Sequence, residues 1–138
     1  MKSHSFLIFS IKPKWANMIA QGSKTYELRR RPPPQSAIGN VAFVYATAPS
    51  SQITCACRVD GILKDNKEEL WHQVGDLTGC TKLEYDEYFR DKDVAYAVEL
   101  KLLYVPIQNL HRQELKQKFG FTIPQSWRWA DELKELIG

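Results

Sequence analysis

Proline positions divide the first 34 residues into a strand, a short helix and a second strand. Ser5 to Ile11 is an apolar, β-prone run that ends at Lys12-Pro13, and proline is favoured in the first helical turn, where its missing amide hydrogen costs nothing. Helical spacing continues to about Gln21, where a glycine supplies the usual stop. Thr25 to Arg30 alternates as a strand until Pro32-Pro33-Pro34, which cannot join a ladder. We therefore expect a strand, helix, strand unit at the start of the chain.

Further alternating and helical patterns follow this unit. The clearest alternation runs from Val94 to Val105, where Ala95, Ala97, Glu99 and Lys101 are predicted to face outward. Five strands with helices between them, several adjacent in sequence, favour an α+β fold built on a small mixed or antiparallel barrel. The other predicted strands span residues 41–47 and 53–63, and the other predicted helices span residues 66–74, 81–90, 112–118 and 130–137.

Length and composition predict one domain over residues 1–138. The chain is 43% hydrophobic and 12% aromatic, which is enough apolar material for a single buried core. No run approaches the roughly 20 apolar residues that a membrane helix needs, so we expect a cytoplasmic protein with no membrane partner. Three cysteines, an odd number, agree with a reducing compartment.

Charge is concentrated in the first unit. Residues 12–31 hold the cations Lys12, Lys14, Lys24, Arg29, Arg30 and Arg31 and the single carboxylate Glu27, which gives +5 against +3 for the whole chain. Such a local cationic surface attracts phosphates or other anions whatever the total charge.

Lys24, Glu27 and Arg29 form the sharpest candidate site. Glu27 and Arg29 share one face of the predicted strand, and Lys24 lies at the preceding turn, within reach of the same cleft. The cations would hold a phosphate or polarise a carbonyl, and Glu27 would accept a hydrogen bond or act as general base. The alternative is an ordinary surface ion pair. Alternation sends Arg29 and Arg30 in opposite directions, so at most two of the three arginines contribute to one site.

Aromatic residues near these cations are candidates for base stacking, which contributes about 1–3 kcal/mol per base. The candidates are Tyr45, Trp127 and Trp129, although for Trp127 a role in closing the barrel end is slightly favoured over stacking. Cys55-Ala-Cys57 has no second Cys or His pair at ligand spacing, so buried small hydrophobes are favoured, and we expect no metal and no cofactor.

Several blocks of the sequence resemble the ASCH domain family of the PUA-like superfold, in its compact single-domain bacterial and phage form. The most specific are Ile11-Lys12-Pro13-Lys14 and the segment Gly22 to Arg30, which contains Gly-x-Lys-Thr-x-Glu-x-Arg. Val44 to Thr47, the Tyr88-Phe89 helix, Ala97-Val98 and Ile123 to Trp127 also resemble later blocks of these proteins. The resemblance implies a barrel of five or six strands flanked by helices, with a cleft beside the first helix and the strand that follows it.

The resemblance also implies binding of nucleic acid, with RNA favoured, or of a modified nucleoside. The expected binding residues are Lys12, Lys14, Lys24, Glu27, Arg29, Arg30, Tyr45, Ser126 and Trp127. Some small relatives are amidohydrolases of acetylated cytidine, so the alternatives are an amidohydrolase that acts on acylated nucleosides, or a nuclease. In an enzyme, Lys24, Glu27 and Thr25 would be catalytic, and Glu99 is a candidate for the distal glutamate of the hydrolases. A regulator that recognises a protein or a small anion is a further alternative.

Overall fold

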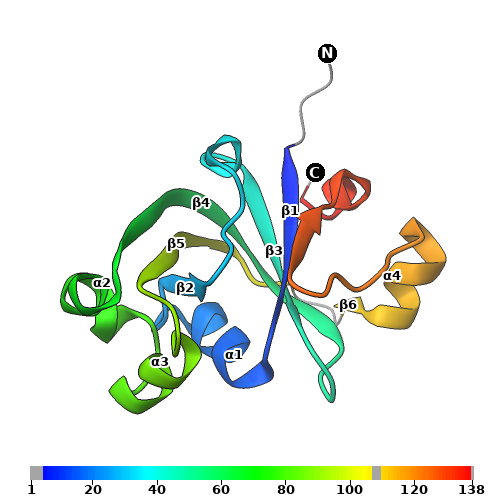
Figure 1. The fold of residues 1–138 in the computed structure, drawn as a ribbon. Helices are drawn as coiled ribbons and strands as arrows, with labels where there is room; N and C mark the ends of the chain where they lie inside the picture. The colour runs from blue at the N-terminus through cyan, green and yellow to red at the C-terminus, as the bar shows by residue number, and fades with distance from the viewer. Residues whose placement is uncertain (1–4, 107–109, 138) are drawn as a thin grey trace.

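The computed structural model describes residues 5–106 and 110–137, which form one mixed sheet with helices packed on both faces (Figure 1). The strands are β1 (Phe6–Ile11), β2 (Tyr26–Arg29), β3 (Val41–Ala46), β4 (Gln52–Asn66), β5 (Val94–Tyr104), β6 (Leu110–His111) and β7 (Trp127–Trp129). The α-helices are α1 (Pro13–Gln21), α2 (Lys67–Val74), α3 (Lys82–Tyr88) and α4 (Arg112–Phe119), and the 3₁₀-helices are η1 (Gln35–Ala37), η2 (Gly75–Leu77) and η3 (Asp131–Leu136).

The sheet has the strand order β2-β5-β4-β3-β1-β7, with β6 paired to β4. The β1–β3 pair is parallel and the other pairs are antiparallel. The predicted α+β class is confirmed. The predicted barrel of five to six strands is corrected, because there are seven strands in the described part of the chain and the end strands β2 and β7 do not pair there. Sequence patterns indicate individual strands, whereas closure of a barrel depends on which edge strands pair.

Side chains of β1 alternate between the two faces of the sheet, and both faces are covered there. Leu7 and Phe9 pack with Ala16 and Ile19 of α1 in one apolar cluster, whereas Ile8 packs on the opposite face against residues of α4 and η3. Successive side chains of a strand point to opposite faces, so a strand covered on both sides must be apolar throughout. This explains why the segment Phe-Leu-Ile-Phe lacks polar residues.

A third apolar cluster joins β2 and β5 to helices α2 and α3. Leu28 of β2 packs with Tyr85 and Phe89, and with Ala95 and Ala97 of β5. The sequence-based expectation that the two alanines face outward is therefore wrong, because α2 and α3 cover that side of β5. Small side chains allow these helices to approach the strand closely.

Two short strands are absent from the sequence-based prediction. β6 has two residues and β7 has three, too few for an alternation pattern to be recognised. β7 exists because Trp127 and Trp129 pair with Phe9 and Leu7 of β1. The predicted helix at residues 130–137 is instead the 3₁₀-helix η3.

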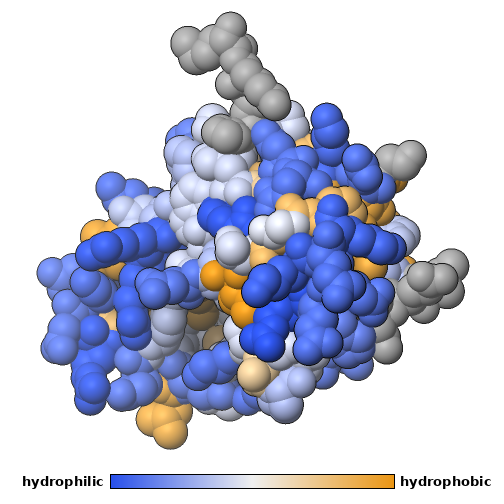
Figure 2. Space-filling view, turned by 90° about the vertical axis from the view of Figure 1, so that its right-hand side faces the viewer, coloured by the Kyte–Doolittle hydropathy of each residue, from blue (hydrophilic) through white to orange (hydrophobic). Residues whose placement is uncertain are grey.

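Helix α4 and η3 present a mostly hydrophilic surface, with small hydrophobic patches between the polar groups, on the face shown in Figure 2. In the described residues, no helix has both the length and the apolar character that crossing a membrane requires.

Gly79 allows the turn before α3 to approach α1. Its φ of +75° lies in the left-handed region, and a Cβ there would meet Met18 Sδ at 2.7 Å and Trp15 Cδ1 at 3.3 Å. Gly39 has a similar φ of +91° but no neighbouring atom within 4 Å of an added Cβ. Alanine substitutions at the two positions therefore differ in side-chain crowding but share the strain of a left-handed backbone.

We predict that Gly79→Ala lowers the free energy of unfolding more than Gly39→Ala. Each substitution should lose about 1–2 kcal/mol from the left-handed backbone, and Gly79→Ala should lose about 1 kcal/mol more because Met18 must move. Urea unfolding of the two variants and the wild type measures the difference. Equal losses would mean that the contact with Met18 adjusts freely.

Candidate functional site

The turn between α1 and β2 places the candidate residues. Pro13 occupies the first turn of α1, and Gly22 ends the helix at φ +85° with its N–H donated to Ile19 O. The chain then turns back through Lys24 into β2, where Glu27 and Arg29 lie on one face and Leu28 on the other. These local signals explain why three charged side chains are directed to one side of β2.

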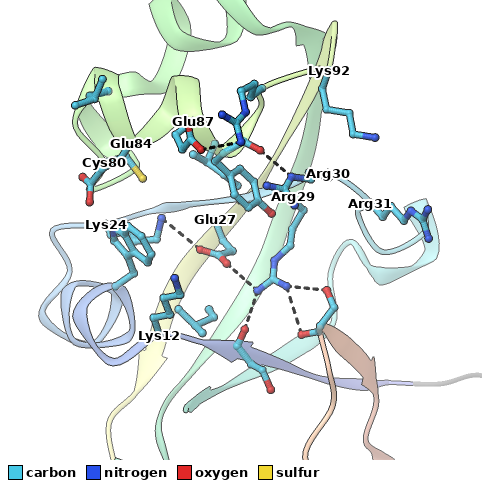
Figure 3. A pocket seen from close by; sticks show the side chains of 18 of the residues that line it. Lys12, Lys24, Glu27, Arg29, Arg30, Arg31, Cys80, Glu84, Glu87 and Lys92 are labelled. Atoms are coloured by element: carbon cyan, nitrogen blue, oxygen red, sulfur yellow. Dashed lines mark hydrogen bonds and ion pairs between the residues drawn. The ribbon is translucent and has the colours of Figure 1, made fainter. Parts of the chain in front are cut away.

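A cavity of about 1160 Å³ lies beside these residues (Figure 3). Its lining comes from the end of β1, the start of α1, β2, helix α3 with the turn after it, and the residue before β7. The charged residues that line it are Lys12, Lys24, Arg29, Arg30, Arg31, Arg90 and Lys92, with Glu27, Glu84, Glu87 and Asp91. Seven cations therefore face four carboxylates.

The Glu27 carboxylate lies between two buried cations. Its Oε2 accepts a hydrogen bond from Arg29 Nη2 at 2.7 Å, and its Oε1 is 3.3 Å from Lys24 Nζ. The exposed fractions are 2% for Lys24, 9% for Glu27 and 8% for Arg29. The group is thus a buried ion system at the cavity wall and not the surface ion pair that the sequence left open.

Lys24 is held by two hydrogen bonds and an ion pair. Its ammonium donates to Tyr26 O at 2.7 Å and to Thr78 O at 2.5 Å, and its Nζ lies 3.3 Å from Glu27 Oε1. At least two of the three ammonium hydrogens are therefore used within the protein. Lys24 thus joins the turn after η2 to β2.

Arg29 extends from β2 to the other end of the sheet. Its Nη1 donates to Ser126 Oγ at 2.8 Å and its Nη2 donates to Ser10 O at 3.1 Å. The guanidinium also lies 5.1 Å from the centre of the Phe9 ring. Because Ser10 belongs to β1 and Ser126 precedes β7, one side chain connects the strands that the backbone leaves unpaired.

The buried group carries one positive charge in excess, because two cations share one carboxylate. Charges taken out of water interact strongly with one another, and an uncompensated cation attracts an anion. Arg29 Nε is buried and has no hydrogen-bond partner. The cavity wall therefore favours a ligand that brings negative charge.

Three more of the expected binding residues, Lys12, Arg30 and Ser126, also line the cavity. Arg30 donates from Nε to Tyr88 O at 2.7 Å and lies 4.4 Å above the Tyr88 ring. Lys12 lies 5.9 Å from the Trp15 ring centre.

Six other candidates from the sequence do not line the cavity: Lys14, Thr25, Tyr45, Glu99, Trp127 and Trp129. Tyr45 is buried on the opposite face of the sheet, where its ring packs against Phe121. Trp127 packs against the α1 side of the core, and Thr25 uses its backbone to bond Leu77 and Leu100. Lys14 is held by Glu84. Residues close in sequence to a site can thus lie outside it, since the pleat and the sheet faces decide direction.

Helix α3 and its following turn supply the lining that the sequence did not predict. Tyr88 is half-buried, and burial raises the pKa of its hydroxyl, with further effects from Arg29 and Glu27. Burial also raises the pKa of the Cys80 thiol, and Lys24 partly opposes that shift. The sequence showed α3 only as an apolar stripe, and nothing in it indicated that the helix faces β2. In the described residues no group of His, Cys, Asp or Glu side chains has the arrangement of a metal site.

We predict that Glu27→Gln destabilises the protein by about 3–5 kcal/mol, because it leaves two buried cations without their anion. Glu84→Gln is the matched control: it removes the carboxylate of an exposed ion pair but retains a capping side chain for α3, so its loss should be much smaller. Chemical unfolding of both variants measures the two losses. Similar losses would contradict the assignment of Glu27 as the centre of a buried ion system.

Lys14 holds α1 against α3 through Glu84. Its Nζ donates to Glu84 Oε2 at 2.8 Å. This bond is the largest cause, and the hydrogen bond from the Thr81 backbone the second largest, of a Glu84 pKa lowered to about 2 from an ordinary value of 4.5. A depressed carboxyl pKa stabilises the fold above the unfolded pKa, and that stabilisation is lost as the pH falls from about 4.5 through about 2.

We predict that Lys14→Gln raises the pKa of Glu84 part of the way toward 4.5, since the bond from Thr81 remains. NMR titration of the Glu84 carboxyl measures this change. Lys82→Gln is the control, because Lys82 pairs with Asp86. An unchanged Glu84 pKa in Lys14→Gln would show that Lys14 is not its partner in solution.

Comparisons with known proteins identify the family of this chain. A family model of the ASCH domain matches residues 9–104. A curated relative from Zymomonas mobilis, described as an ASCH domain-containing ribonuclease, is 29% identical over 133 residues and covers 94% of this chain and 88% of its own length.

Crystal structures from the same organism are similar over nearly the whole chain. The structure of ASCH from Zymomonas mobilis has a TM-score of 0.89 at 28% identity and covers 98% of this chain and 95% of its own. A serine-to-alanine variant of that protein has a TM-score of 0.88 at 26% identity and covers 99% of this chain and 97% of its own. A tyrosine-to-phenylalanine variant has a TM-score of 0.87 at 27% identity and covers 96% of each chain.

Proposed function

This chain belongs to the ASCH domain family, and from that membership and the chemistry of the cavity we propose that it binds RNA there and cleaves it. The observation that carries the proposal is the buried Lys24–Glu27–Arg29 group with its excess positive charge. The relative described as a ribonuclease, 29% identical over most of both chains, supports RNA as the substrate.

Phosphate binding follows from the charges of the lining. An RNA backbone carries one negative charge per nucleotide, and the cavity offers more cations than carboxylates. Lys24 and Arg29 are held rigidly by hydrogen bonds, so their charges need no reorganisation when an anion arrives. Backbone phosphates would lie over this wall, with Lys12 and Arg30 on either side.

Cleavage would use the 2′-hydroxyl of the substrate. Glu27 is the carboxylate within this charged group, and as general base it would take the 2′-hydroxyl proton while the 2′-oxygen bonds to the adjacent phosphorus. The bond from phosphorus to the 5′-oxygen breaks, and that oxygen takes a proton from the Tyr88 hydroxyl or from water. The products are a 2′,3′-cyclic phosphate and a 5′-hydroxyl. Lys24 and Arg29 stabilise the added charge on the phosphate oxygens.

The alternative activity, amide hydrolysis of an acylated nucleoside, has weaker support from the side chains. Glu99, the candidate for the distal glutamate, lies on β5 opposite Tyr26 of β2 and is not among the residues that line the cavity. Thr25 is not among them either. Substitution of Glu99 or Thr25 should therefore impair amide hydrolysis of an acylated nucleoside but leave RNA cleavage unchanged.

The test is cleavage of a fluorescent single-stranded RNA, with DNA of the same sequence and acylated nucleosides as the other substrates. The wild type should cleave RNA and leave DNA intact, because DNA lacks the attacking hydroxyl. Glu27→Gln should cleave about 100-fold more slowly or worse, as expected for loss of a general base. Circular dichroism at the assay temperature establishes that this variant is folded.

Glu99→Gln and Thr25→Ala are the matched controls and should cleave RNA at the wild-type rate. Undiminished cleavage by folded Glu27→Gln would remove Glu27 from the mechanism. Binding of RNA without cleavage would overturn the catalytic half of the proposal. Hydrolysis of acylated nucleosides with no action on RNA, lost in Glu99→Gln, would establish the alternative.

A further inference from the structure

Four cations that line the cavity have no carboxylate partner among the described residues. Arg30 is held by Tyr88. The other three, Lys12, Arg31 and Lys92, also take part in none of the ion pairs found there. Arg90, in contrast, pairs with Glu87 at 3.2 Å, although both side chains are exposed. An unpaired cation on a cavity rim remains available to a ligand, whereas a paired one must first give up its partner.

These cations lie at two separate places on the rim. Lys12 joins β1 to α1, whereas Arg31 follows β2 and Lys92 lies in the turn between α3 and β5. In the view of Figure 3, Lys12 is on one side of Glu27, and Arg31 and Lys92 are on the other. The Lys24–Glu27–Arg29 group thus lies between two sources of free positive charge.

The contact between Arg30 and Tyr88 fixes the positions of Arg31 and Lys92. The guanidinium of Arg30 bonds the backbone of Tyr88 and stacks on its ring, which ties the end of β2 to the end of α3. Arg31 is the next residue after Arg30, and Lys92 follows Tyr88 by four positions. Two segments distant in sequence therefore present cations together, and the Asp91 carboxylate between Arg90 and Lys92 offsets only part of that charge.

We propose that this rim binds consecutive phosphates of a single strand that crosses the cavity from Lys12, over Glu27, to Arg31 and Lys92. The inference rests on the proposed function and specifies its substrate class: an oligonucleotide of several nucleotides, not a nucleoside or a single nucleotide. One phosphate reaches only one end of the rim. The cavity volume of about 1160 Å³ also exceeds the roughly 300–1,000 Å³ typical of small-molecule sites.

The test compares binding of single-stranded RNAs of two, four and eight nucleotides at several salt concentrations, with 2′-O-methyl groups in place of the 2′-hydroxyls so that the protein cannot cleave them. For the wild type, affinity should rise with length until both ends of the rim are occupied, and then level off. In the double variant Arg31→Gln/Lys92→Gln, the slope of log K against log salt for the longest RNA should fall by about 1.4, because each single-strand phosphate contact contributes about 0.7.

The double variant Lys116→Gln/Lys118→Gln is the matched control. It removes the same net charge from α4. No residue of α4 lines the cavity, and α4 and α3 lie on opposite sides of the molecule (Figure 1). Its salt slope and its dependence on RNA length should equal those of the wild type. DNA of the same length should respond to both double variants as RNA does, because the rim contacts phosphates.

Each outcome supports or overturns the inference. Equal losses in the two double variants would assign the effect to overall charge and overturn it, and so would an unchanged slope in Arg31→Gln/Lys92→Gln. In both cases wild-type binding and cleavage would leave the proposed function standing. A wild type that binds no RNA at low salt would overturn the proposed function, and the inference with it.

Discussion

The Glu27 carboxylate holds together the part of the molecule on which both fold and site depend. It neutralises one of two cations that have almost no access to water, and those cations in turn hold three separate segments. Lys24 binds the turn after η2, and Arg29 binds β1 and the residue before β7. Without the carboxylate, two buried charges would repel each other, at a cost that surface interactions could not offset.

Arg29 also links the two ends of the open sheet. Within residues 5–106 and 110–137, the backbone of β2 pairs with β5 alone and that of β7 with β1 alone, so the ladder ends on both sides. The guanidinium crosses that gap with donors in a fixed plane, a geometry that arginine provides and lysine does not. Side-chain hydrogen bonds of Arg29 thus connect β2 to β1 and to the residue before β7, and the cavity lies beside them.

Stability and function are joined at this group. The excess positive charge that the folded protein must tolerate also makes the cavity wall favourable to an anion, and hydrogen bonds hold Lys24 and Arg29 in place. The rim differs in this respect. Lys12, Arg31 and Lys92 are exposed and carry little of the stability, so the rim can vary in charge without loss of the fold.

The sequence alone determined the β1, α1, β2 unit and the common face of Glu27 and Arg29, because proline, glycine and strand alternation act over a few residues. It also determined the α+β class. Only the tertiary structure decided that the sheet stays open, that Ala95 and Ala97 are covered, and that Tyr45 faces away from the site. It also decided that α3 and the turn before it bring Tyr88 and Cys80 to the cavity. Each of these depends on which surfaces meet across long separations in the chain, and local periodicity carries no information about such contacts.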